Sequence, residues 1–123
     1  LHTLAHDWNK PDGAEALSRW DRFMADQLSY FLDRMSDSKE DSTSLLDNTV
    51  VLYGSSNSTT HNNRNYPLVL AGGGELGLHH GQYLRFDEKV PMSNLLLTML
   101  HCVGAEQDAF SDSTNDLTEI LKS

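Results

Sequence analysis

The chain has 123 residues, enough for one domain with a modest core, and its 18 acidic and 9 basic residues give a net charge of −9. This acidic balance argues against the basic face that nucleic acids and anionic membrane surfaces require. No stretch approaches the roughly 18 consecutive apolar residues typical of a membrane-spanning helix. Cys102 is the single cysteine, so no internal disulfide is expected, and its apolar surroundings predict a buried thiol rather than a nucleophile.

The first predicted element is a helix from Ala14 to Met35. Apolar residues recur there at spacings of three and four, which puts on one helix face Leu17, Trp20, Met24, Leu28, Phe31, Leu32 and Met35. Asp12, in the turn-forming stretch before the helix, is the expected N-cap. The aromatic stripe is expected in the core rather than at a ligand site, and it consists of Trp20, Phe23, Tyr30 and Phe31. The polar stretch Ser36–Ser44 is expected to be a solvated loop.

Two short apolar runs follow, at Thr49–Tyr53 and Pro67–Ala71, and glycines bound both of them. Continuous apolar runs of this length are typical of strands covered on both faces, as in a parallel sheet. Gly81–Phe86 is expected to be a third, edge-type extended segment. His79 and His80 lie in a glycine-rich stretch and are expected to be exposed turn residues rather than ligands.

Two further helices are predicted near the carboxy-terminal end. Pro91 opens the first, Met92–Val103, which Gly104 ends, and a short second helix is expected around Thr114–Leu121. The order helix, strand, strand, helix predicts an α/β fold in one domain over residues 1–123. Buried strands need neighbours on both sides. We therefore expect further strands to come from an amino-terminal part of a longer protein, or from another copy of this chain in a homo-oligomer.

The histidines are the best candidates for a functional site. His2 and His6 are four residues apart, so on a helix both imidazoles face the same side. Asp7 adds a carboxylate, and His61 is expected to join from the loop after the first strand. Neutral imidazoles with a carboxylate suit zinc, manganese or iron, and an open coordination position permits activation of water. The alternative is that His2 and His6 are surface residues and that His61 forms hydrogen bonds in its loop.

Segments along the whole chain also carry a family resemblance. His2–Asp7 is similar to a His-x-x-Ser-His-His motif, Leu45–Ser55 to an "LLDNT-hydrophobic-YGS" strand, and Asn65–Gly73 to an "LP-hydrophobic-LAGG" segment. Pro91–Leu100 is similar to a "TPLNNLFLSLL" helix and Phe110–Thr114 to an "FGDST" end. Together and in this order they resemble the carboxy-terminal part of the uncharacterised bacterial family that is named for the His-x-x-Ser-His-His motif and is common in planctomycetes.

The resemblance implies a distant relation to the alkaline phosphatase and sulfatase superfamily. It therefore implies a fragment of an α/β/α sandwich with a short, mostly parallel sheet, and a periplasmic or secreted location. The superfamily's nucleophile and several of its metal ligands lie upstream of the matching region. This chain also departs from the motif, with Ala5 in place of the serine and Asp7 in place of the last histidine.

The leading functional expectation is an uncharacterised domain that is not catalytic by itself. It contributes structure and part of a histidine-rich site for zinc or another divalent metal, with the ligands His2, His6, Asp7 and His61. Two other classes stay open. One is a metal-dependent hydrolase of phosphate or sulfate esters, and the other is a protein-interaction or oligomerisation module.

Overall fold

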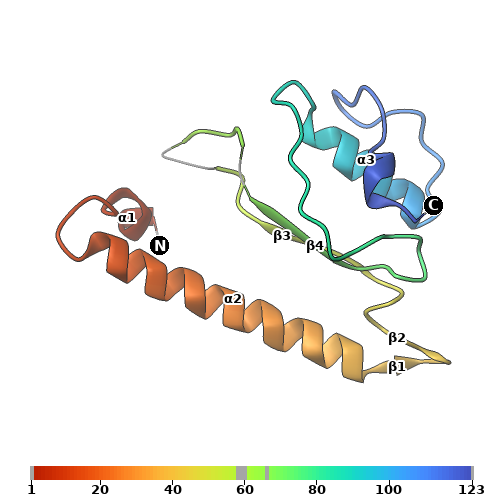
Figure 1. The fold of residues 1–123 in the computed structure, drawn as a ribbon, viewed down its shortest axis with the longest axis horizontal. Coiled ribbons are helices and arrows are strands. Elements are labelled where there is room, and N and C mark those ends of the chain that lie inside the picture. Colours follow the sequence, from red (N-terminus) through yellow and green to blue (C-terminus); the bar gives the residue numbers. More distant parts are fainter. Residues whose placement is uncertain (1, 58–60, 66, 123) are drawn as a thin grey trace.

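The computed structural model describes residues 2–57, 61–65 and 67–122 and shows a mixed α/β architecture (Figure 1). Its elements are α1 (His2–His6), α2 (Gly13–Asp37), β1 (Lys39–Glu40), β2 (Thr43–Ser44), β3 (Val50–Gly54), β4 (Leu68–Gly72), α3 (Met92–Cys102) and the 3-10 helix η1 (Thr118–Ile120). The β3–β4 sheet lies between α3 on one side and α2 on the other. Within the described residues, no helix combines the length and the apolar character needed to cross a membrane.

The β3–β4 sheet is antiparallel, with Val50 opposite Gly72 and Leu52 opposite Leu70. The expectation of a mostly parallel sheet is therefore wrong. A parallel pair needs a crossover, usually a helix, to return the chain to the start of the neighbouring strand, and the described part of the β3–β4 loop contains none. The expectation of strands covered on both faces is also only partly met, because most residues of β3 and β4 are half-buried and Val69 is 47% exposed.

Helix α2 confirms the helix predicted at Ala14–Met35 and extends beyond both ends of it. Met35 is buried, and the half-buried residues of its stripe are Leu17, Trp20, Met24, Leu28 and Leu32. The expectation that the aromatic residues belong to the core is wrong for Phe23, Tyr30 and Phe31, whose exposed fractions are 52%, 65% and 48%. Phe23 and Tyr30 lie roughly a third of a turn from the stripe, because successive residues are about 100° apart around a helix.

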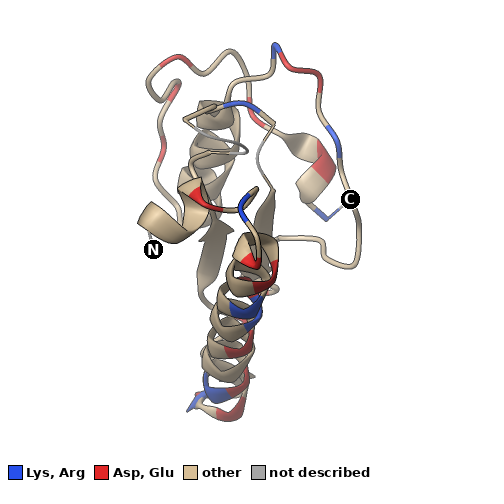
Figure 2. Ribbon diagram, turned by 90° about the vertical axis from the view of Figure 1, so that its left-hand side faces the viewer, with Lys and Arg blue, Asp and Glu red and all other residues tan. Residues whose placement is uncertain are grey.

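The N-terminal end of α2 is held by the backbone rather than by the expected side-chain cap. Asp12 has a left-handed φ of 62° and makes no side-chain capping bond, although its carbonyl accepts the first helical hydrogen bond from Ala16. Charged residues of both signs alternate along the helix (Figure 2), with ion pairs Glu15–Arg19 and Asp37–Arg34. This mixture does not form a basic face.

The stretch after α2 is a small hairpin rather than only a solvated loop. Strands β1 and β2 pair antiparallel, and the turn that follows is locked by Asp47. Its Oδ2 accepts hydrogen bonds from the backbone N–H of Ser44 at 3.0 Å and from the Ser44 hydroxyl at 2.7 Å. The adjacent Asn48 donates from Nδ2 to the Thr43 hydroxyl at 2.7 Å. The "LLDNT" segment therefore fixes the turn between the hairpin and β3.

Removal of the Asp47 charge is expected to change how stability depends on pH. The hydrogen bonds from the side chain and backbone of Ser44 lower the pKa of Asp47 from its usual 3.8. A lowered pKa contributes stability that is present above the unfolded value and is lost as pH falls through the folded value. In Asp47→Asn, the urea midpoint measured by circular dichroism should therefore fall less steeply below about pH 5 than in the wild type.

Asp41→Asn is the matched control for this prediction, because Asp41 is an exposed turn residue with a left-handed φ of 53° that asparagine tolerates. The control should keep the pH dependence of the wild type. Equal pH slopes for Asp47→Asn and the wild type would contradict the role given to Asp47.

The hydrophobic core lies between the sheet, α3 and the C-terminal segment. Its buried residues Leu78, Leu117 and Ile120 are surrounded by half-buried Val50, Leu70, Val90, Leu95, Cys102 and Leu121. Leu78 is only 1% exposed and packs against Gly73, where an added Cβ would lie 2.8 Å from a Leu78 methyl carbon. Gly73 also has a φ of +68°, so both the close approach and the backbone require glycine.

Two expectations for the C-terminal half are wrong. Gly81–Phe86 forms no strand, and the helix expected around Thr114–Leu121 is reduced to the single turn of η1. In the latter segment, polar side chains of α3 accept hydrogen bonds from backbone N–H groups that precede η1. Asn94 Oδ1 accepts from the N–H of Thr114 at 2.8 Å, and the Thr98 hydroxyl accepts from the N–H of Leu117 at 2.7 Å. These hydrogen bonds tie the segment before η1 to α3.

Candidate metal centre

Helix α1 presents two histidines on one side, as predicted. His2 and His6 are separated by one helical turn, and the centres of their rings are 4.5 Å apart in an edge-to-face arrangement. Both side chains are exposed to solvent. The local sequence is therefore sufficient to create this half of the site.

His61 joins the pair from the loop between β3 and β4. Its ring centre lies 5.1 Å from that of His6 and 6.2 Å from that of His2. The backbone of His61 is left-handed, with a φ of 54°, a conformation that is uncommon for residues other than glycine and that is found at binding sites. The fold thus brings three imidazoles together from two remote segments, and we call these three side chains the histidine cluster.

The spacing of the histidine cluster can be compared with a zinc site. Three imidazoles that share a tetrahedral zinc at about 2.1 Å from each donor nitrogen have ring centres roughly 5 Å apart. The observed spacings of 4.5, 5.1 and 6.2 Å bracket that value. With the side chains as oriented here, no three His, Cys, Asp or Glu residues in the described part of the chain are arranged to hold a metal ion. Coordination by the histidine cluster therefore requires these exposed side chains to move from the positions described here.

Asp7, the fourth predicted ligand, has a different partner in this structure. Its carboxylate forms an ion pair with Lys10 at 2.7 Å, and its N–H donates to the carbonyl of Thr3. Asp7 follows His6 directly, so on a helix it points about 100° away from that side chain. Its role as a metal ligand stays a prediction.

The other histidines form hydrogen bonds with the backbone or face solvent. His79 and His80 are exposed, as predicted, and Nε2 of His80 lies 2.5 Å from the carbonyl oxygen of Gly72. Nε2 of His101 lies 2.7 Å from the carbonyl oxygen of Gln107. These partners give His80 and His101 structural roles apart from the histidine cluster.

Cys102 is half-buried at the edge of the core. Burial raises the pKa of its thiol above the usual 9.0, so the thiol is protonated at neutral pH. A protonated thiol is a poor nucleophile, which agrees with the structural role expected for this residue.

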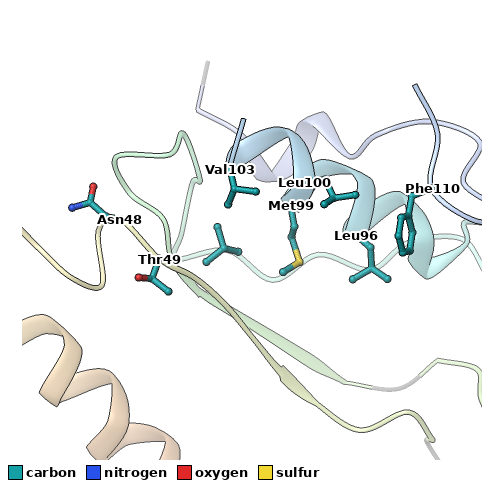
Figure 3. Close-up of a pocket in the computed structure, with 8 residues that line it drawn as sticks. Asn48, Thr49, Leu96, Met99, Leu100, Val103 and Phe110 are labelled. Atoms are coloured by element: carbon teal, nitrogen blue, oxygen red, sulfur yellow. The ribbon is translucent and has the colours of Figure 1, made fainter. Parts of the chain in front are cut away.

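An apolar groove between α3 and the start of β3 was not predicted from the sequence (Figure 3). It encloses about 420 Å³ and is lined by Asn48, Thr49, Val50, Leu96, Met99, Leu100, Val103 and Phe110. The three-to-four spacing of apolar residues along α3 was its only signal in the sequence. Its apolar walls offer packing surface rather than groups for acid–base chemistry.

Comparisons with protein-family models, with curated proteins and with solved structures gave no match.

Proposed function

We propose that this chain is a non-catalytic structural domain whose histidine cluster binds a divalent transition metal ion, with zinc as the first choice. The observation that carries the proposal is the meeting of His61 with the His2–His6 pair. One histidine pair on a helix is common on protein surfaces. A third imidazole, delivered by a remote loop residue in a left-handed conformation, gives the number of protein ligands found in three-histidine zinc sites.

The nitrogen donors of the histidine cluster limit the kinds of metal ion that it can bind. Imidazole nitrogen suits zinc, copper, nickel and iron, whereas magnesium and calcium prefer sets of oxygen ligands. The net charge of −9 favours the approach of a cation. Bound metal would connect α1 to the β3–β4 loop and leave a coordination position open to solvent.

Replacement of His61 by asparagine is expected to weaken zinc binding at least about tenfold. Loss of a residue that only supports a metal ligand typically lowers metal affinity about tenfold or more, and loss of the ligand itself should lower it at least as much. Asparagine tolerates the left-handed backbone at this position, so the change removes the imidazole with little added strain. Isothermal titration with ZnCl₂ at neutral pH measures affinity and stoichiometry, and one zinc per wild-type chain is expected.

His79→Asn is the matched control, because His79 is also exposed but lies outside the histidine cluster. It should bind zinc like the wild type. Absence of zinc binding by the wild-type chain, or equal affinities of His61→Asn and the wild type, would refute the proposed function.

A metal-dependent hydrolase of phosphate or sulfate esters is the second candidate. The observation that favours it is the exposure of all three rings, because a three-histidine zinc open to solvent can hold and activate water. Hydrolysis of p-nitrophenyl phosphate or sulfate by the zinc-loaded wild type, abolished in His61→Asn, would support this function over a purely structural metal.

The β3–β4 sheet is narrow, with two strands in the described residues. We propose that further strands from a longer protein, or from a second copy of this chain, extend the β3–β4 pair. The layered order of α3, sheet and α2 supports an α/β/α arrangement. A likeness to alkaline phosphatases and a periplasmic or secreted location remain parts of this proposal.

A further inference from the structure

Helix α2 forms an outer layer of the molecule and carries exposed aromatic side chains (Figure 1). Phe23 and Tyr30 are more than half exposed, and the half-buried Trp20 contacts Phe23 with 5.9 Å between the ring centres. Because successive residues are about 100° apart around a helix, these side chains lie beside the half-buried stripe that includes Met24 and Leu28. Apolar residues that cluster on a surface mark interaction sites, whereas single exposed ones are ordinary.

The residues on this side of α2 are spaced for packing against another helix. From Ala16 to Arg34 the intervals along the chain are four, three, four, three and four residues, which is the heptad spacing of paired helices. We call these six positions the aromatic face, and they are Ala16, Trp20, Phe23, Gln27, Tyr30 and Arg34. The aromatic face is therefore suited to a single partner helix rather than to a broad surface.

A second copy of α2 that runs antiparallel matches the aromatic face. The intervals are the same in both chain directions, so Trp20 lies opposite Tyr30 of the second copy, and Ala16 lies opposite Arg34 of the second copy. In a parallel pair, Arg34 would meet Arg34 of the second copy instead, and like charges placed in contact are destabilising. The aromatic face therefore favours an antiparallel pair.

Charged residues that flank the aromatic face are complementary in the same arrangement. Arg19 and Asp33 are both exposed and lie near opposite ends of the face, so each Arg19 meets Asp33 of the second copy. The two-fold symmetry of a homodimer makes this contact twice. Within one chain, positions 19 and 33 are about 21 Å apart along the helix, so these two side chains do not pair with each other. Asp26 opposes the pairing, because it lies near the two-fold axis and meets Asp26 of the second copy.

We propose that this chain forms a homodimer through the aromatic face of α2, with the two helices antiparallel and with ion pairs between Arg19 of one copy and Asp33 of the other. This dimer does not depend on a metal at the histidine cluster, and it uses a different surface from the edges of the β3–β4 sheet. Three aromatic side chains from each copy supply most of its apolar area, so the dimer is small and reversible rather than obligate.

Sedimentation velocity over a concentration series tests the dimer, with EDTA present so that no metal links two chains. At physiological ionic strength, repulsion between the net charges of −9 is screened beyond about 8 Å. Tyr30→Ala should weaken the dimer at least about tenfold, because it removes an aromatic anchor from both copies. Tyr83→Ala is the matched control, since Tyr83 is 90% exposed and lies outside α2, and it should dimerise like the wild type. A wild type that stays monomeric, or equal dimerisation of Tyr30→Ala and the wild type, would overturn the proposal.

A charge exchange tests the antiparallel direction. Arg19→Asp and Asp33→Arg each turn two attractive contacts into repulsive ones, so each single variant should weaken the dimer about tenfold. The double variant with both changes restores opposite charges across the interface and should dimerise nearly as well as the wild type. Effects within one helix cannot produce this rescue, because the two positions are about 21 Å apart. A double variant no stronger than the single variants would show that the antiparallel pairing is wrong.

Discussion

Leu78→Ala is expected to lower the free energy of unfolding by about 3 kcal/mol, the usual cost of truncating a fully buried leucine. Leu78 is 1% exposed and lies at the centre of the core, where it meets Leu117 and Ile120 of the C-terminal segment. The alanine variant loses the transfer free energy of the side chain and leaves a cavity. The close contact with Gly73 restricts collapse of that cavity, because Gly73 has no side chain to move into it.

Urea unfolding followed by circular dichroism measures this loss. Leu84→Ala is the control, because it makes the same leucine-to-alanine change at an exposed position. Leu84 is 37% exposed in a segment that forms no strand. It is expected to change stability by less than about 1 kcal/mol. A similar loss in both variants would show that Leu78 is not the centre of the core.

Thr98→Val is expected to destabilise the chain by about 2 kcal/mol, although valine has nearly the same shape as threonine. Thr98 is completely buried, and its hydroxyl accepts a hydrogen bond from the N–H of Leu117 and donates one to the carbonyl of Asn94 at 2.9 Å. The valine variant leaves a buried N–H without its acceptor. Because Leu117 is also buried, water does not replace the lost partner readily.

Thr98→Ser separates the hydroxyl from the methyl group. Serine keeps both hydrogen bonds and is expected to lose only about 1 kcal/mol through the missing methyl group. Hydrogen exchange at the amide of Leu117 gives a local readout and should be faster in Thr98→Val than in Thr98→Ser. If serine is as destabilising as valine, the packing of the methyl group, and not the hydrogen bonds, explains the burial of Thr98.

The sequence predicts most of the local structure. The spacing of apolar residues defined α2, and the pair Pro91 and Gly104 marked the ends of the α3 region closely. The two apolar runs became β3 and β4, each displaced by one residue from its predicted range. These features depend on contacts within a turn or two of chain, so they can be recognised from neighbouring residues alone.

For the candidate site, too, the local sequence predicts one part and the fold determines the rest. The interval of four residues between His2 and His6 places their rings together on any helix. The sequence only raised the possibility that His61 would join them, while the path of the β3–β4 loop determines the distance. The ion pair of Asp7 with Lys10 is local in sequence, yet the direction in which Asp7 points depends on where α1 ends.

The features that only the tertiary structure determines have one physical origin. They depend on competition among contact partners that are remote from one another in the chain. Strand direction follows from the course of a loop, and the apolar pattern of a buried strand is the same in parallel and antiparallel sheets. In the C-terminal segment, Asn94 and Thr98 of α3 accept hydrogen bonds from backbone N–H groups that are about twenty residues away in the sequence, and only η1 is helical there. Composition, charge and periodicity predicted α2, α3, β3 and β4, and which histidines pair on α1. The fold determined which of those elements meet, and it brought His61 to the histidines of α1.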